Sequence, residues 1–124
     1  MPIIKSLWPD DIGQSDLVTP VSIMREQAAL LGEKTGNLVT AEVVTTSQSG
    51  LLTHSFSLDA PALSYRYLLF YARHQIALYP VDVTYQSTVR QCADEAQFRQ
   101  RLGEILSSDA TKQVVKALIA QSRG

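Results

Sequence analysis

The sequence predicts a two-layer α+β domain in which one N-terminal and two C-terminal helices pack on a four-stranded antiparallel meander sheet. The first observation is the order of apolar periods, which changes from helical to strand-like and back and gives α-β-β-β-β-α-α. The second is the shortness of the links between strands, because a parallel crossover needs a dozen or more residues. Helices that precede and follow the strands most simply cover one face of the sheet.

The N-terminal helix has clear start and stop signals. Thr19 is an N-cap candidate, Pro20 occupies the first helical position, where no N–H is needed, and Gly36 lies just past the end. Between them, apolar residues recur at steps of three and four: Val21, Met24, Ala28 and Leu31.

Residues 1–18 precede this helix without a sustained period, so the sequence predicts an extended arm at 1–18 and a single domain at 19–124. A wholly solvated tail rarely carries large apolar residues, and this arm has several. We therefore expect the arm to be pinned to the body at one spot by Ile3, Ile4, Leu7 and Trp8.

Four segments alternate or are richly apolar, as strands do: 38–43, 52–58, 65–72 and 79–85. The turn cluster at 47–50 makes the first two a hairpin, and residues 73–75 are expected to turn after the third. Pro80 cannot donate to a ladder, so it is expected near the start of a strand or on an edge.

The helical period returns after Ser87. Asp94 followed by Gln97 has the form of a capping box. Phe98, Leu102 and Ile105 form the apolar stripe of the first helix. Residues 107–109 end that helix and cap the next, whose buried side is formed by Val114, Val115, Leu118 and Ile119.

Composition indicates a globular protein of the cytoplasm. The charged fraction of 19% and the net charge of −1 provide no strong field toward nucleic acid or an anionic membrane. The charges are unevenly divided, with seven acids and three bases in residues 1–60 but five acids and eight bases in 61–124. The single cysteine, Cys92, fits a reducing compartment. No apolar run approaches the about 20 residues of a membrane helix, and no signal peptide is expected.

Familiar catalytic and nucleotide-binding motifs are absent, and the sequence predicts no catalytic, cofactor-binding or metal-ligating residues. His54 shares a strand face with Phe56 and Leu58, which favours a core histidine with a satisfied hydrogen bond over a catalytic one. His74 is expected to be exposed in a turn. Cys92 is expected to be a buried or inert thiol, because no sequence spacing brings a base to it.

The segment at 65–72 is the most unusual one, because it is apolar or aromatic on both faces. Alternation places Tyr65, Tyr67, Leu69 and Tyr71 on one face of the strand. A single helical layer cannot cover two apolar faces, and tyrosine is enriched at protein interfaces. These four residues, with Arg66 and Arg73, are therefore the predicted interaction site.

The motifs at 19–20, 25–28, 34–37, 60–63 and 78–81 (TP, REQA, KTGN, APAL and LYPV) resemble those of a group of small uncharacterised bacterial proteins. The likeness covers residues 19 to about 121. The resemblance implies a bacterial, cytoplasmic protein and carries over no activity, catalytic residue or binding residue.

Three functions are consistent with the sequence. The favoured one is a non-enzymatic protein-interaction module, either a homodimer or a small adaptor, immunity or antitoxin-like protein, which binds protein through the tyrosine-rich face. The second is a small hydrolase or transferase that uses His54 or Cys92, with Arg66 or Arg73 binding an anion. The third is a single-stranded nucleic-acid binder in which Tyr65 and Tyr67 stack on bases beside Arg66 and Arg73.

Overall fold

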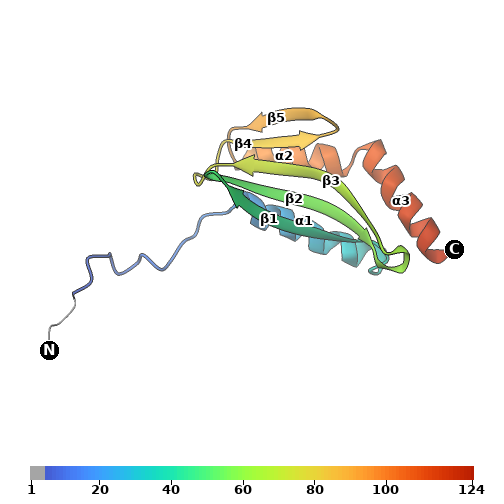
Figure 1. The fold of residues 1–124 in the computed structure, drawn as a ribbon, viewed down its shortest axis with the longest axis horizontal. Helices are drawn as coiled ribbons and strands as arrows, with labels where there is room; N and C mark the ends of the chain where they lie inside the picture. The colour runs from blue at the N-terminus through green and yellow to red at the C-terminus, as the bar shows by residue number, and fades with distance from the viewer. Residues whose placement is uncertain (1–4) are drawn as a thin grey trace.

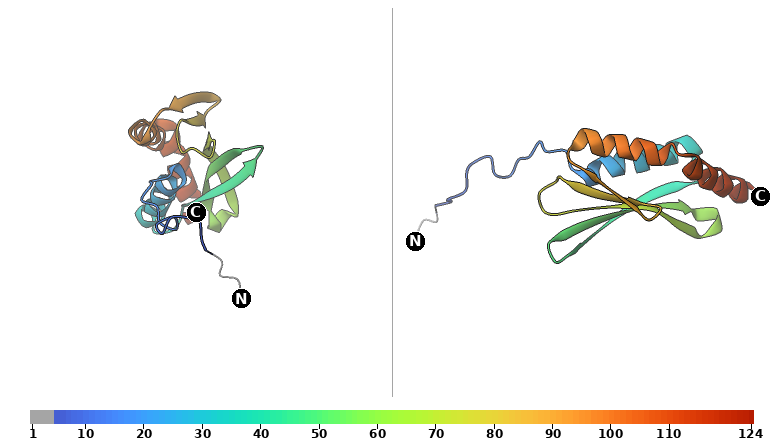
Figure 2. Two further views of the ribbon diagram at one scale, coloured as in Figure 1. Left: turned by 90° about the vertical axis from the view of Figure 1, so that its left-hand side faces the viewer. Right: turned by 90° about the horizontal axis from the view of Figure 1, so that it is seen from above.

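The computed structural model describes residues 5–124 and has an α+β fold, in which three helices lie on one side of an antiparallel sheet (Figures 1 and 2). The elements in chain order are α1 (Pro20–Thr35), β1 (Thr40–Gln48), β2 (Leu51–Ala60), the 3-10 turn η1 (Pro61–Leu63), β3 (Tyr65–His74), β4 (Val81–Tyr85), β5 (Thr88–Cys92), α2 (Glu95–Leu106) and α3 (Asp109–Arg123). The predicted fold class and order of layers are confirmed, and the sheet has five strands in the order β1-β2-β3-β4-β5.

The fifth strand corrects the predicted order. Residues after Ser87 were expected to connect to a helix, but β5 pairs with β4 from Tyr85↔Thr88 onward. Gln86 and Ser87 link the two strands with φ angles of 49° and 65°, as in a type I′ turn. Such turns favour Asn and Gly, so Gln and Ser at these positions did not indicate a turn.

A bulge in the ladder between β2 and β3 determines which side chains of β3 face the helices. The register passes from Phe56↔Phe70 to Ser57↔Leu68, which leaves Leu69 as an extra residue. One extra residue inverts the alternation of side chains. Odd-numbered residues of β3 therefore face the helical layer before the bulge, and even-numbered residues face it after the bulge.

The helix ends follow the predicted signals. Thr19 Oγ1 accepts a hydrogen bond from the Ser22 amide at 3.1 Å, and Gly36 ends α1 with a φ of 60°. Asp94 Oδ1 accepts from the Gln97 amide at 2.9 Å at the start of α2. These bonds satisfy backbone groups that a helix terminus leaves without partners.

The core fills the space between the helices and the sheet. Phe56 and Phe70 stack across the bulged ladder with ring centroids 5.0 Å apart. The helices contribute Ile23 and Met24 from α1 and Phe98, Leu102 and Ile105 from α2, all at most 2% exposed. Helix α3 is less deeply packed, since only Thr111 and Leu118 are buried in it.

The arm ahead of α1 extends away from the body (Figures 1 and 2). Leu7 and Trp8 are 95% and 71% exposed, so the expectation that they pin the arm to the body is wrong. Ile3 and Ile4, which belonged to the same expectation, lie outside the described residues.

Candidate functional site

The bulge separates the four residues that were predicted to share one face of β3. Tyr71 lies on the open face of the sheet, beyond the bulge. Tyr67 is opposite the buried Leu58, so Tyr67 and Tyr65 point to the helical side. Leu69, the extra residue, is 7% exposed. The prediction of one tyrosine-rich face is therefore wrong, because it assumed unbroken alternation.

Tyr65 and Tyr67 line a recess of about 490 Å³ beside α3. Their side chains are partly exposed, at 50% and 37%. Helix α3 forms the opposite wall of the recess with Val114, Ala117, Leu118 and Gln121. The two tyrosines thus remain available for contact, but at the helical side of the molecule.

The two arginines of the predicted site lie on the open face and are engaged there. Arg66 Nε donates to Asp59 Oδ1 at 2.8 Å, and Arg66 also pairs with Glu42. Arg73 Nε donates to Thr53 Oγ1 at 3.2 Å, and its guanidinium lies 5.7 Å from the ring centroid of Tyr71. The predicted nucleic-acid platform is therefore divided, since its arginines face away from Tyr65 and Tyr67.

A cleft between α1 and α3 reaches down to residues of the core. We define the α1–α3 cleft, of about 210 Å³, by its ten lining residues: Gln27, Leu30, Leu31, Lys34, Phe56, Leu58, Leu69, Leu106, Thr111 and Val115. Seven of the ten are apolar, and Phe56 and Leu58 from β2 are core residues. Leu30 on α1 is 42% exposed, which is high for a leucine beside the core. The cleft therefore presents an uncovered apolar surface.

His54 and His74 form a buried pair on the helical side of β2 and β3. The two side chains are 2% and 5% exposed, and their Nε2 atoms are 2.8 Å apart. The prediction that His54 is a core residue with satisfied hydrogen bonds is confirmed. The expectation that His74 is exposed in a turn is wrong, because β3 continues through His74 and carries its ring inward.

The partners of the pair assign its protons when both rings are neutral. Nδ1 of His74 lies 2.5 Å from the carbonyl oxygen of Gln75, which can only accept, so this nitrogen carries the proton. Nε2 of His74 then accepts from Nε2–H of His54. Nδ1 of His54 accepts in turn from the hydroxyl of Thr45 at 2.8 Å. Every ring nitrogen is used, and none is left to act on a substrate.

Burial lowers the pKa of His54 to about 4, with smaller contributions from the neighbouring His74 and from Arg25. A base of this strength is poorly matched to proton transfer near pH 7. The pair thus favours a structural role over general base catalysis.

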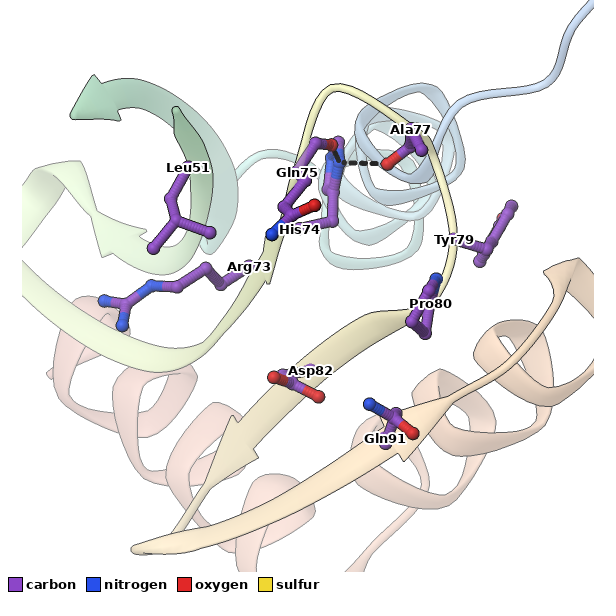
Figure 3. Close-up of a pocket in the computed structure, with 9 residues that line it drawn as sticks. All are labelled: Leu51, Arg73, His74, Gln75, Ala77, Tyr79, Pro80, Asp82 and Gln91. Atoms are coloured by element: carbon purple, nitrogen blue, oxygen red, sulfur yellow. Dashed lines mark hydrogen bonds between the residues drawn. The ribbon is translucent and has the colours of Figure 1, made fainter. Parts of the chain in front are cut away.

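A polar recess of about 440 Å³ lies beside the pair and is lined by residues of β3, β4, β5 and the loop after β3 (Figure 3). Arg73, Asp82 and Gln91 line it from three neighbouring strands. The ring of His74 points toward the carbonyl oxygens of Gln75 and Ala77, away from Asp82 and Gln91 (Figure 3). A molecule bound in this recess would therefore meet no free imidazole nitrogen.

Cys92 is a free, buried thiol at the end of β5, as expected. Burial raises the pKa of the thiol, and the nearby Arg101 and Arg90 only partly oppose this effect. A nucleophilic cysteine needs a lowered pKa and an accessible sulfur. The surroundings of Cys92 give it neither.

Within residues 5–124, no three or more His, Cys, Asp and Glu side chains gather as metal ligands would. None of the helices in this part of the chain has the length and apolar character needed to cross a membrane.

Comparisons with protein-family models, with curated proteins and with solved structures found no match. The resemblance to small uncharacterised bacterial proteins therefore stays a prediction.

The sequence pattern missed the α1–α3 cleft as a site. The apolar stripe of α1 accounts for Leu31 but not for Leu30, which stands beside the stripe at an exposed position. A leucine outside the stripe was the one available signal, since the floor of the cleft comes from β2 and β3 and depends on the bulge.

Proposed function

We propose that this protein is a protein-binding module that holds an apolar segment of a polypeptide in the α1–α3 cleft. The observation that carries the proposal is the uncovered apolar lining of this cleft, with Leu30 at its edge and core residues at its floor. Exposed apolar surface that continues into a core is typical of interaction sites. Tyr65 and Tyr67, on the other flank of α3, provide a second contact area of the kind that interfaces favour.

The size of the cleft favours side chains over a small molecule. Small-molecule pockets usually have volumes of about 300–1,000 Å³. The cleft has about 210 Å³, which suits one or two anchoring side chains of a longer segment. Binding through a few buried anchors is how most interfaces gain their affinity.

The geometry supports this function better than the two alternatives. A hydrolase or transferase would need a free His54 or a reactive Cys92, yet both are buried and neither has the pKa for the task. The predicted single-strand binder would need Tyr65 and Tyr67 on the same surface as Arg66 and Arg73, yet Tyr67 and Arg66 face opposite sides of β3.

The test is selection of a displayed library of 12-residue peptides on the purified protein, followed by affinity measurement for the enriched peptides. We expect enriched sequences to share apolar anchors. Leu30→Glu should weaken their binding at least about tenfold, which corresponds to about 1.4 kcal/mol, because it places a charge in the apolar cleft.

Ile76→Glu is the matched control, because Ile76 is 86% exposed in the loop after β3 and does not line the cleft. Peptide affinity should be unchanged in this variant. Equal loss of peptide affinity in both variants would contradict the proposal.

A cytoplasmic location belongs to the same proposal. The one cysteine is a free thiol, which a reducing compartment preserves.

A further inference from the structure

The arm carries apolar side chains that have no partner within its own body. Every described arm residue from 5 to 18 is exposed. Five of them are large and apolar: Leu7, Trp8, Ile12, Leu17 and Val18, at 95%, 71%, 59%, 70% and 41% exposure. Water-exposed side chains of this size in one segment indicate a segment that binds elsewhere.

The charges of the arm complement those around the cleft. Asp10, Asp11 and Asp16 outnumber Lys5 in the described arm. Lys34 is the one charged residue among those that line the cleft. Lys112 lies one helical turn from Val115, a lining residue of α3, and is exposed.

None of these charged groups forms an ion pair among the residues that the structure describes. An acidic, apolar segment would therefore find both its apolar contacts and its counter-ions at the cleft.

The exit of the arm favours the cleft of another copy over its own. Thr19 is extended, with φ of −92° and ψ of 153°, and its side chain caps α1. The arm leaves this cap directed away from the body (Figures 1 and 2). The cleft is lined by the other half of α1, from Gln27 to Lys34, so binding in its own cleft would require a reversal of the chain at the capped end.

We propose that the arm of one copy occupies the α1–α3 cleft of a second copy, and that the exchange is reciprocal. This inference rests on the proposed function, since it names the occupant of the same cleft. Each copy contributes one arm and one cleft. Two copies therefore fill each other's clefts, and the assembly closes as a two-fold dimer.

Trp8 provides the test, because it is the only tryptophan of the chain. The 124-residue protein is diluted in steps while its mass is measured by light scattering and its tryptophan emission is recorded. We expect a dimer with blue-shifted emission that becomes a monomer with red-shifted emission in one concentration range. Red emission from a dimer, blue emission from a monomer, or a monomer at every concentration would overturn the inference.

Two variants assign the contact. Ile12→Glu keeps Trp8 and changes a residue that is 59% exposed and lies outside the hydrophobic core, so the domain should stay folded. It should raise the dimer dissociation constant at least about tenfold, and Leu30→Glu should do the same. Ile76→Glu should leave the constant unchanged. A dimer that Ile12→Glu does not weaken would overturn the inference.

The same variant separates this inference from the proposed function. If the Ile12→Glu variant still binds library peptides in the cleft and the wild-type protein is always monomeric, arm exchange is wrong while the cleft remains a binding site. If no peptide binds to Ile12→Glu, the proposed function itself fails.

Discussion

The hydrogen-bond chain through Thr45, His54 and His74 can hold one added proton but not two. With one proton added to His54, both of its ring nitrogens donate, Nε2 to Nε2 of His74 and Nδ1 to the hydroxyl of Thr45. A second proton would bring two N–H groups together at a separation of 2.8 Å. The buried pair therefore resists full protonation, in line with the lowered pKa of His54.

This resistance predicts a loss of stability in mild acid. His54 has a pKa of about 4 in the folded protein and 6.5 as its ordinary value. Between these values the unfolded chain binds more protons, so the contribution of neutral His54 is complete above pH 6.5 and is lost as pH falls to 4. This difference in the pKa of His54 corresponds to about 3 kcal/mol in the free energy of unfolding.

Urea unfolding of the wild type and of His54→Gln, measured from pH 7.5 to 4, checks this. Carboxylates titrate in both proteins, so the difference between the two curves isolates His54. A difference that stays constant across this range would contradict the assignment.

At the residue scale the sequence predicted the core position of His54 but not that of His74. His54 belongs to a plain alternation with Phe56 and Leu58. His74 lies between the polar residues Arg73 and Gln75, which obscured its place two positions after the buried Ala72. The step of two from Ala72 was the available signal.

At the scale of elements, local chemistry predicted most helix ends, whereas pairing between strands was harder to predict. The caps at Thr19 and Asp94 involve residues three apart, so a single sequence contains both partners. The bulge at Leu69 depends on how β3 fits β2, which no local pattern encodes. The predicted single face of Tyr65, Tyr67, Leu69 and Tyr71 was wrong for this reason, since these residues were chosen by an alternation that the bulge breaks.

The capping box of α2 gives a prediction at this scale. Asp94 accepts from the Gln97 amide, and Gln97 Oε1 accepts from the Ala93 amide at 2.8 Å. Asp94→Ala should lower the free energy of unfolding by about 1 kcal/mol. Asp94→Asn keeps a side-chain acceptor, so it should lower the free energy of unfolding by only a few tenths of a kcal/mol. Urea unfolding measures both changes. Equal losses would assign the effect to charge at the helix end instead.

At the scale of the whole molecule, opposite charges lie on the two parts that we propose to meet. The described arm has a surplus of acids, whereas α3 carries Lys112, Lys116 and Arg123 against Asp109. Exposed ion pairs contribute about 0.2–1 kcal/mol each and are screened by salt.

The dimer should therefore weaken as salt rises. We expect its dissociation constant to increase on the order of threefold between low and high ionic strength, because one or two exposed pairs are screened. Analytical ultracentrifugation across a sodium chloride series measures the change, and Lys112→Gln should reduce the slope. Tighter association at high salt in both proteins would indicate contact through apolar groups alone.

Because each strand of the sheet pairs with the next along the chain, the hairpins of the sheet can form in the order of synthesis. Hairpin contacts are local and form quickly, whereas the domain as a whole folds as a unit once the helices that complete its core are made. The arm is made before every other element, while Val115 and the α3 wall of the cleft follow only after the whole sheet and α2. A nascent chain thus offers an arm before it has a cleft, so reciprocal exchange is restricted to chains that have already released α3 from the ribosome.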